Sequence, residues 1–148
     1  MHIVHVGAFP FPSPQGSQVY VKGLLNGLSS LNHRVSLLCY GHGEGEVDAN
    51  YEIIRTPNIP GYHNMRAGPD FVKPFLDLYL SLLLTRIKPD IVHVHNYEAP
   101  LIEFIAQLRR KIPVVYSAHN LMEEELHTYF ERPIFKRVAN KFGRVLDQ

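Results

Sequence analysis

Ile3-Val4-His5-Val6-Gly7 and Ile91-Val92-His93-Val94-His95 are two short runs of similar character, one near the start of the chain and one past its middle. Both are rich in β-branched residues, which favour strands. The first run leads into the Pro-rich stretch 10–16, and the second follows the helix breaker Pro89-Asp90. Their apolar residues are nearly continuous, which is typical of strands buried on both faces of a parallel sheet.

Outward from these two runs, predicted strands alternate with predicted helices. We expect Ser17 to be an N-cap, and Asn32 to end the same helix because Asn tolerates the left-handed conformation usually given to Gly. The expected strands cover residues 3–7, 35–40, 51–55, 91–95 and 113–117, and the expected helices cover residues 17–31, 70–87, 101–111 and a stretch from 121 onward. This alternation predicts a Rossmann-like, doubly wound α/β domain with a mainly parallel sheet and helices on both faces. The link between the second and third strands is too short for a long crossover helix, so the sequence pattern does not determine where the third strand lies in the sheet.

The composition is that of one ordinary globular domain. The chain has 148 residues, of which 45% are hydrophobic and 20% charged, as in most folded domains. Its formal net charge of +1 disfavours a nucleic-acid partner, since nucleic-acid-binding proteins are usually basic.

The start of the chain lacks a signal-peptide pattern, and the most apolar window, residues 75–87, is shorter than the ~20 residues of a membrane span. The single cysteine, Cys39, cannot form an internal disulfide, so we expect a cytoplasmic protein.

The candidate functional site lies in the loops that follow the strands, because doubly wound sheets bind ligands beyond the carboxyl ends of their strands. These loops cover residues 8–18, 95–100 and 117–121. The first one leads through Gly16, Ser17 and Gln18 into a helix N-terminus, where free amides and the helix dipole favour an anion such as a diphosphate. The alternative is that Gly16 only makes a turn at the helix entry. Dinucleotide and P-loop sites are disfavoured because neither Gly-x-Gly-x-x-Gly nor Gly-Lys-Ser/Thr is present.

Three histidines belong to these loops and to the strands before them. His93 and His95 are two residues apart on one strand and therefore point to the same face, and His119 follows the neighbouring strand. We interpret His93 as a hydrogen-bonded core residue, and His95 and His119 as site residues. The alternative is that all three bind zinc in a metal-dependent hydrolase. No cysteine or obvious carboxylate completes that set, so we expect no metal.

Residues 132–146 have the pattern of a basic amphipathic helix. We expect its basic face to be solvated and its apolar face to cover the core. The functional alternative is a peripheral contact with the anionic lipid head groups of a membrane.

Three longer stretches occur in a specific order: HIVHVGAFPFPSPQGSQVYVKGLLNGLSSLNHRV (2–35), KPDIVHVHNYEAPLIEFIAQ (88–107) and IPVVYSAHNLMEEELHTYF (112–130). Together they resemble the N-terminal domain of GT-B glycosyltransferases of the group 1, or family 4, type. The chain departs from the family's usual pattern in two places. The family often has Gly-Gly where Gly16-Ser17 stands, and Gly-His-Glu-Val where residues 32–35 read Asn-His-Arg-Val.

The resemblance implies a retaining transfer of a sugar from a nucleotide-sugar donor to a glycan, lipid or small-molecule acceptor, with no cofactor or metal. It also implies that residues 1–148 are the acceptor-side domain, that the nucleotide sugar is held mainly by a C-terminal domain outside this chain, and that the chain alone is inactive. By position, it assigns the amides of Gly16, Ser17 and Gln18 to the donor diphosphate, His119 to catalysis beside the transferred sugar, and His95, Asn96, Tyr97 and Glu98 to the acceptor. A non-catalytic domain that binds an anion or nucleotide at Gly16 is the alternative from another class.

Overall fold

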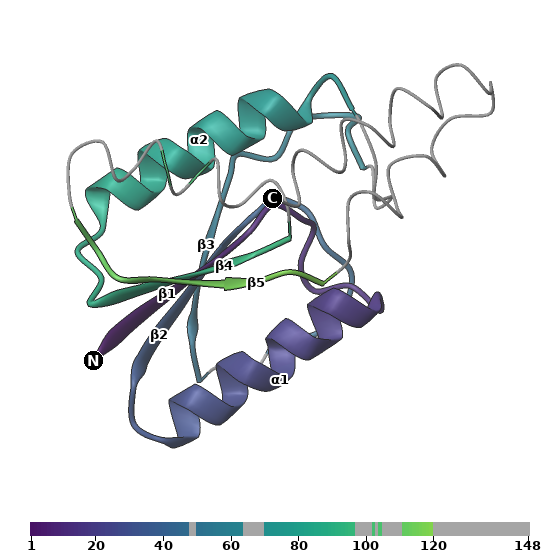
Figure 1. Ribbon diagram of the computed structural model, residues 1–148. Coiled ribbons are helices and arrows are strands. Elements are labelled where there is room, and N and C mark those ends of the chain that lie inside the picture. The colour runs from purple at the N-terminus through teal and green to yellow at the C-terminus, as the bar shows by residue number, and fades with distance from the viewer. Residues whose placement is uncertain (48–49, 64–69, 97–101, 103, 105–110, 120–148) are drawn as a thin grey trace, which may run out of the picture.

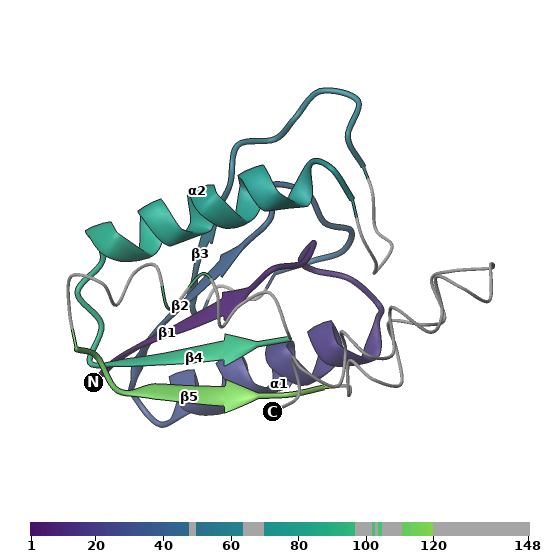
Figure 2. The ribbon, with the colours of Figure 1, turned by 45° about the horizontal axis from the view of Figure 1, so that its top comes forward.

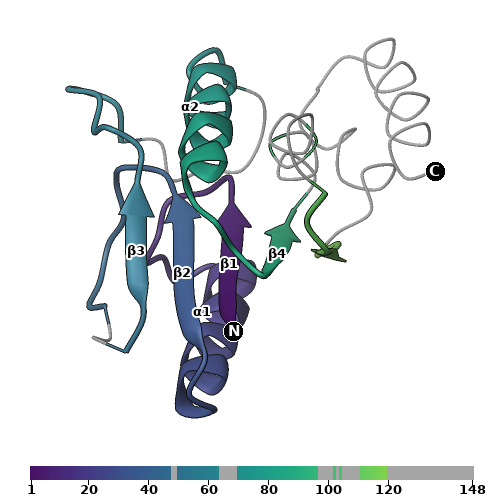
Figure 3. The ribbon, with the colours of Figure 1, turned by 90° about the vertical axis from the view of Figure 1, so that its left-hand side faces the viewer.

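The architecture is a parallel sheet between two helices (Figure 1), in a computed structural model that describes residues 1–47, 50–63, 70–96, 102, 104 and 111–119. In these residues, the strands lie in the order β3-β2-β1-β4-β5, and all neighbours are parallel. Figure 3 shows β3, β2, β1 and β4 side by side. The elements are β1 (His2–Gly7), α1 (Gly16–Ser30), β2 (Arg34–Cys39), β3 (Glu52–Arg55), α2 (Lys73–Arg86), β4 (Ile91–His95) and β5 (Val114–Ser117). The predicted Rossmann-like, doubly wound α/β fold is confirmed.

The strand order reverses between β1 and β4. From β1 the chain moves outward through β2 to β3, and then returns through α2 to β4 and β5 on the other side of β1. α1 covers one face of the sheet and α2 covers the other (Figure 1). The register pairs His5 with His93 and Gly7 with His95. The carboxyl ends of β1 and β4 therefore meet at the position where doubly wound folds bind ligands.

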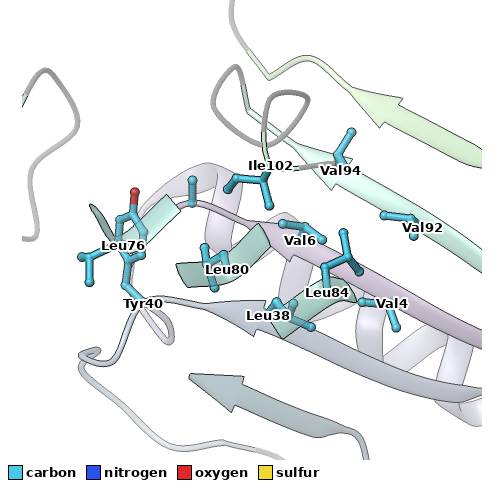
Figure 4. Close-up of a cluster of buried hydrophobic side chains, with 11 residues drawn as sticks. Val4, Val6, Leu38, Tyr40, Leu76, Leu80, Leu84, Val92, Val94 and Ile102 are labelled. Carbon is cyan, nitrogen blue, oxygen red and sulfur yellow. The ribbon is translucent and has the colours of Figure 1, made fainter. Parts of the chain in front are cut away.

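The α2 face of the sheet carries an aliphatic core (Figure 4). Leu76, Leu80 and Leu84 recur every fourth residue on α2 and are all buried in this cluster. Every second residue of a strand points to the same face, so β1 and β4 present a row of valines to these leucines: Val4, Val6, Val92 and Val94. Full burial of one such side chain contributes about 1.5–3 kcal/mol to folding, which fixes α2 on the sheet.

The α1 face carries a second core that includes the loop after β1. Phe9 and Phe11 of this loop belong to one buried cluster with Leu25 of α1 and Cys39 of β2. Burial raises the pKa of the Cys39 thiol to about 12, although the nearby Arg55 opposes this shift. The loop that leads to the candidate site is thus part of the folded core.

The C-terminal end of α1 is the one predicted. Asn32 follows the helix with a φ of 60°, in the left-handed region that Asn tolerates. Its N–H donates to the Ser29 carbonyl (3.0 Å), and the N–H of His33 donates to the Leu28 carbonyl (3.3 Å). This pair of bonds is a Schellman motif, which satisfies carbonyls that the end of the helix leaves without partners.

The described part of the link between β2 and β3 runs along the loop after β1 and contains no helix. The N–H of Phe11 donates to the His42 carbonyl (3.1 Å), and the N–H of Glu44 donates to the Pro12 carbonyl (2.7 Å). From the end of β3, the Arg55 guanidinium donates to the Phe11 carbonyl. These bonds hold the loop after β1 against the carboxyl end of the sheet. They also explain how β3 comes to lie beside β2, a position that the sequence pattern does not determine.

Two predicted helices lie largely or wholly outside the described residues, namely 101–111 and the stretch from 121 onward. In the first, Ile102 is buried in the α2-face core and Phe104 is exposed. Among the described residues, no helix combines the length and the apolar character that crossing a membrane requires.

Candidate active site

Four histidines gather on the α1 face of the sheet. Because side chains alternate along a strand, His93 and His95 point away from the valines of β4 that fill the α2-face core. His5 lies on the same face of β1, and the strand register places it beside His93. His119 follows β5, the strand that pairs with β4. Three strands therefore bring these rings together.

Three of the rings form a hydrogen-bonded line, which we call the histidine line: His5, His95 and His119. Nδ1 of His5 lies 3.0 Å from Nε2 of His95, and Nδ1 of His95 lies 3.3 Å from Nε2 of His119. The rings of His5 and His95 are nearly parallel, at 9°. Both of these residues are fully buried, whereas His119 is partly exposed. The histidine line thus begins in the interior and ends at a side chain that a ligand can reach.

His93 contacts the histidine line from the side. Its ring centroid lies 4.2 Å from that of His95 and 5.0 Å from that of His5. Its Nε2 lies 2.8 Å from the hydroxyl oxygen of Ser117 in β5. His93 is therefore hydrogen-bonded, as interpreted from the sequence, but it is half-buried and not enclosed in the core.

The surroundings favour the neutral form of all four imidazoles. Burial, and next the neighbouring His93, lower the pKa of His5 to about 3. Burial is also the main reason why the pKa of His95 falls to about 2, with the other three histidines adding to the shift. The pKa values of His93 and His119 are lowered as well, again chiefly by burial. A neutral imidazole has one N–H donor and one acceptor nitrogen, so these rings act through directional hydrogen bonds.

A metal ion has one candidate set of ligands among the described residues. One ligand atom from each of His5, His93 and His95 lies within 4.8 Å of the others. The predicted alternative set of His93, His95 and His119 needs correction, because His5 takes the place of His119. A hydrogen bond joins Nδ1 of His5 to Nε2 of His95, so one of these two nitrogens carries a proton. In the described part of the chain the set contains no carboxylate or thiolate.

The first turn of α1 offers backbone amides at the carboxyl end of the sheet. Gln15 occupies the N-cap position without a capping bond from its side chain, and the N–H of Val19 donates to the Gln15 carbonyl (2.9 Å). The prediction of Ser17 as N-cap is wrong, because the helix already begins at Gly16. The N–H groups of residues 16–18 precede the first helical bond and have no acceptor within the helix. The helix dipole adds to their attraction for an anion.

The three residues predicted to bind a diphosphate differ in exposure. Gly16 is exposed, and a Cβ atom built on it would meet no atom within 4 Å. The Ser17 hydroxyl donates to Oε1 of Gln18 (2.7 Å), and Nε2 of Gln18 donates to Oε1 of Gln15 (3.2 Å). Because Gln18 is buried, its side chain supports the start of the helix, and its backbone N–H is the group available to a ligand.

Tyr20 connects this end of α1 to the histidine line. Its ring stands edge-on to that of His119, with the ring centroids 5.3 Å apart and the planes at 72°. Figure 2 shows α1 passing behind β4 and β5. Tyr20 lies about one helical turn after Gly16, so the free amides and His119 border the same part of the molecule.

Of the residues predicted to bind an acceptor, His95 and Asn96 are described. His95 is fully buried, and both of its ring nitrogens face other histidines. Asn96 has a φ of 63° and donates its N–H to the Ser117 carbonyl (3.3 Å), which fixes the chain where it leaves β4. Tyr97 and Glu98 lie outside the described residues, as does the basic stretch 132–146. Direct acceptor contacts by these residues stay predictions.

Sequence reasoning missed two members of the site, His5 and Tyr20. A histidine within an aliphatic strand was a usable signal, because a buried polar side chain needs a partner. That partner, His95, is 90 residues away along the chain, and only the register of β1 against β4 identifies it. Tyr20 gave no comparable signal, because an exposed tyrosine on a helix is common.

The chain matches a known protein family and a solved structure. The family model described as Glycosyltransferase Family 4 matches residues 14–146. Among solved structures, the chain is similar to sucrose-phosphate synthase from Thermosynechococcus elongatus, with a TM-score of 0.68 and 12% sequence identity. This match covers 96% of our chain and 39% of that one, and at this identity it concerns the fold.

A search among curated proteins found no match to the chain. The family match nevertheless spans nearly all of it, and the matched segment contains the first turn of α1, all of β4 and β5, and His119. The chain therefore belongs to Glycosyltransferase Family 4 and has the Rossmann-like fold of a GT-B N-terminal domain.

Proposed function

We propose that this chain is the acceptor-side domain of a retaining glycosyltransferase that moves a sugar from a nucleotide-sugar donor to a glycan, lipid or small-molecule acceptor. The observation that carries the proposal is the placement of His119. This neutral imidazole follows β5, its Nε2 lies 3.3 Å from Nδ1 of His95, and its ring centroid lies 5.3 Å from that of Tyr20. It is thus held near the free amides of α1, and it is partly exposed.

The amides of Gly16, Ser17 and Gln18 would receive the donor diphosphate. Negative charge grows on this leaving group as the bond to the sugar breaks. Donors that are already oriented toward such a charge lower the barrier without further reorganisation. Gly16 suits this role because no side chain stands between its backbone and the space in front of it.

His119 would hydrogen-bond to a hydroxyl group of the transferred sugar and so orient the sugar against the acceptor. Its lowered pKa leaves it neutral, which suits a positioning hydrogen bond to an uncharged hydroxyl. The acceptor would lie beyond the end of β4, against Asn96, Tyr97 and Glu98, with His95 beneath them.

The proposal includes a second domain that is not part of this chain. In it, a C-terminal domain holds most of the nucleotide sugar, the isolated chain is inactive, and the helix expected over 132–146 contacts a membrane surface when the acceptor is a lipid. No metal or other cofactor takes part. The protein would work in the cytoplasm.

The test is His119→Ala in the intact two-domain enzyme, assayed with a panel of radiolabelled nucleoside-diphosphate sugars. Loss of one well-placed hydrogen-bonding group typically costs about 100-fold or more in rate, and we expect a fall of about that size with an unchanged melting temperature. His33→Ala is the matched control, because His33 lies just before β2, at the amino end of the strands and so at the opposite end of the sheet from the candidate site. Full transfer activity in His119→Ala would overturn the assigned role. Binding of nucleoside diphosphates without any turnover in the intact protein would favour the non-catalytic alternative.

The metal-dependent alternative has its own test, because three histidines do come together. We expect elemental analysis of protein purified without chelator to find less than one-tenth equivalent of zinc. We also expect EDTA to leave transfer unchanged. One equivalent of zinc, lost in His5→Leu, would instead establish a metal centre.

A further inference from the structure

The starting observation is that His5, a residue with no surface exposure, is connected to the exposed site by hydrogen bonds that run through His95. We propose that His5 and His95 are positioning residues that fix the tautomer of His119, so that His119 carries its proton on Nδ1 and offers that N–H to the substrate. The importance of this for sugar transfer rests on the function proposed above, whereas the tautomer itself can be measured independently.

The direction of the hydrogen bonds follows from the inner end of the line. Nε2 of His5 is buried and has no hydrogen-bond partner among the described residues. Buried N–H groups without an acceptor are rarer in proteins than buried acceptor atoms without a donor, so a bare nitrogen is favoured at this position. The single proton of the neutral ring then lies on Nδ1 of His5, which donates to Nε2 of His95.

The same rule then passes along the line. His95 accepts at Nε2, and as a neutral ring it carries its one proton on Nδ1. That proton is donated to Nε2 of His119. His119 in turn has its proton on Nδ1, the nitrogen that does not face His95. The tautomer of a histidine is set by the hydrogen bond that its other nitrogen makes.

His93 stays outside this sequence of donors. It contacts the rings of His5 and His95, but its Nε2 is engaged with the Ser117 hydroxyl. Its contribution is to pack against both rings and to hold them in place. The polarity of the line therefore depends on His5 and not on His93.

The consequence for the site is a restriction on the atom that His119 can meet. A fixed Nδ1–H is a donor only, so the substrate must present an acceptor, such as a hydroxyl or carbonyl oxygen. Without His5 to set the direction, His119 would interconvert between its two tautomers, and part of the population would turn a lone pair toward the sugar.

The test compares two replacements of His5. One preserves the packing of the ring better, and the other preserves its hydrogen bond. His5→Leu keeps most of the buried volume but no polar atom. His5→Asn is smaller, but its side-chain amide nitrogen can donate from about the position of Nδ1. Long-range proton–nitrogen NMR spectra of this chain, labelled with ¹⁵N-histidine and assigned through His119→Gln, report the tautomer of each ring.

We expect the Nδ1–H form of His119 in the unmodified chain and in His5→Asn, and a mixture of both forms in His5→Leu. An Nε2–H form in the unmodified chain overturns the proposal whatever the variants do. An unchanged His119 in folded His5→Leu overturns it as well.

In the intact enzyme, we expect His5→Leu to lower kcat about tenfold with an unchanged KM for the donor, and His5→Asn to restore most of kcat. A purely structural role for His5 predicts the reverse order, with Leu tolerated better than Asn. If His119→Ala leaves transfer intact, the proposed function fails, while the NMR result still decides on the line itself.

Discussion

Tyr20 of α1 meets His119 edge-on, with ring centroids 5.3 Å apart, and so joins the first helix to the end of the last described strand. Aromatic pairs of this kind contribute about 0.5–1.5 kcal/mol beyond their buried area. In the intact enzyme we expect Tyr20→Ala to lower kcat by up to about tenfold, because His119 loses its lateral support. Tyr20→Phe keeps the ring and should retain full activity. Steady-state kinetics check both.

The control for this prediction is Val19→Ala. Val19 is the neighbouring exposed residue, at 57% exposure against 52% for Tyr20. The Val19→Ala variant should transfer sugar as fast as the unmodified enzyme. Equal losses in both variants would show that the surface of α1, and not the ring contact, is what matters.

Replacing Gly16 should weaken ligand binding without destabilising the fold. Its Cβ position is empty and its φ is not in the left-handed region, so Gly16→Ala should leave the melting temperature unchanged or slightly raised. We expect it to weaken binding of a nucleoside diphosphate to the intact enzyme about tenfold, because the methyl group keeps the diphosphate away from the amides. Isothermal titration calorimetry measures this.

Gly23, farther along α1, is the matched control. It also has nothing within 4 Å of its Cβ position. Gly23→Ala should stabilise the helix by about 0.5–1 kcal/mol and leave diphosphate binding alone. If Gly16→Ala binds as well as the unmodified enzyme, Gly16 merely makes the turn into α1.

Gly7 lies at the opposite extreme. A Cβ atom there would come within 2.2 Å of the Phe9 ring, and Phe9 is itself buried. Forcing an additional carbon into a packed core typically costs about 1–3 kcal/mol, so Gly7→Ala should lower the free energy of unfolding by that amount in urea titrations. In a Phe9→Ala background, the penalty should largely disappear. An undiminished penalty there would mean that the strain comes from the backbone.

The free energy of unfolding should decrease as the pH is lowered, because of the buried histidines. The pKa of His5 is about 3 and that of His95 about 2 in the folded chain, against roughly 6.5 when unfolded. Below pH 6.5 the unfolded chain therefore binds more protons, so stability is fully present above that pH and is lost as the pH falls. Each group contributes a slope of about 1.4 kcal/mol per pH unit. The two together should remove roughly 3 kcal/mol between pH 6.5 and 5.

Urea unfolding at a series of pH values tests this, with His5→Leu for comparison. That variant lacks one of the two most strongly shifted groups, so its slope between pH 6.5 and 5 should be less steep. Identical slopes in the two proteins would mean that His5 takes up its proton without unfolding.

Much of the fold followed from local pattern. The β-branched runs placed every strand to within one residue of its observed ends, because aliphatic continuity marks a strand buried on both faces. Asn32 was identified as the end of α1 because its left-handed φ is a property of one residue. Ser17 was wrong as N-cap, since Ser, Gly and Gln can all stand near a helix start and tertiary packing of the preceding loop decides among them.

The site was harder to predict because its contacts are non-local. His95 and His119 were singled out from their places at strand ends, but His5 becomes their partner only through the pairing of β1 with β4. The place of β3 likewise depends on hydrogen bonds between two loops, such as that from Phe11 to His42. Such bonds join segments whose separation in the sequence leaves no periodic signal.

The burial of Cys39 gives the chain an internal reporter. Its thiol is the only one in the sequence, it belongs to the α1-face core together with Phe9 and Phe11, and its raised pKa of about 12 leaves almost no reactive thiolate. An alkylating reagent can reach it only when the sheet and the loop after β1 separate. The rate of labelling at Cys39 therefore measures how often this half of the domain opens, without any engineered probe.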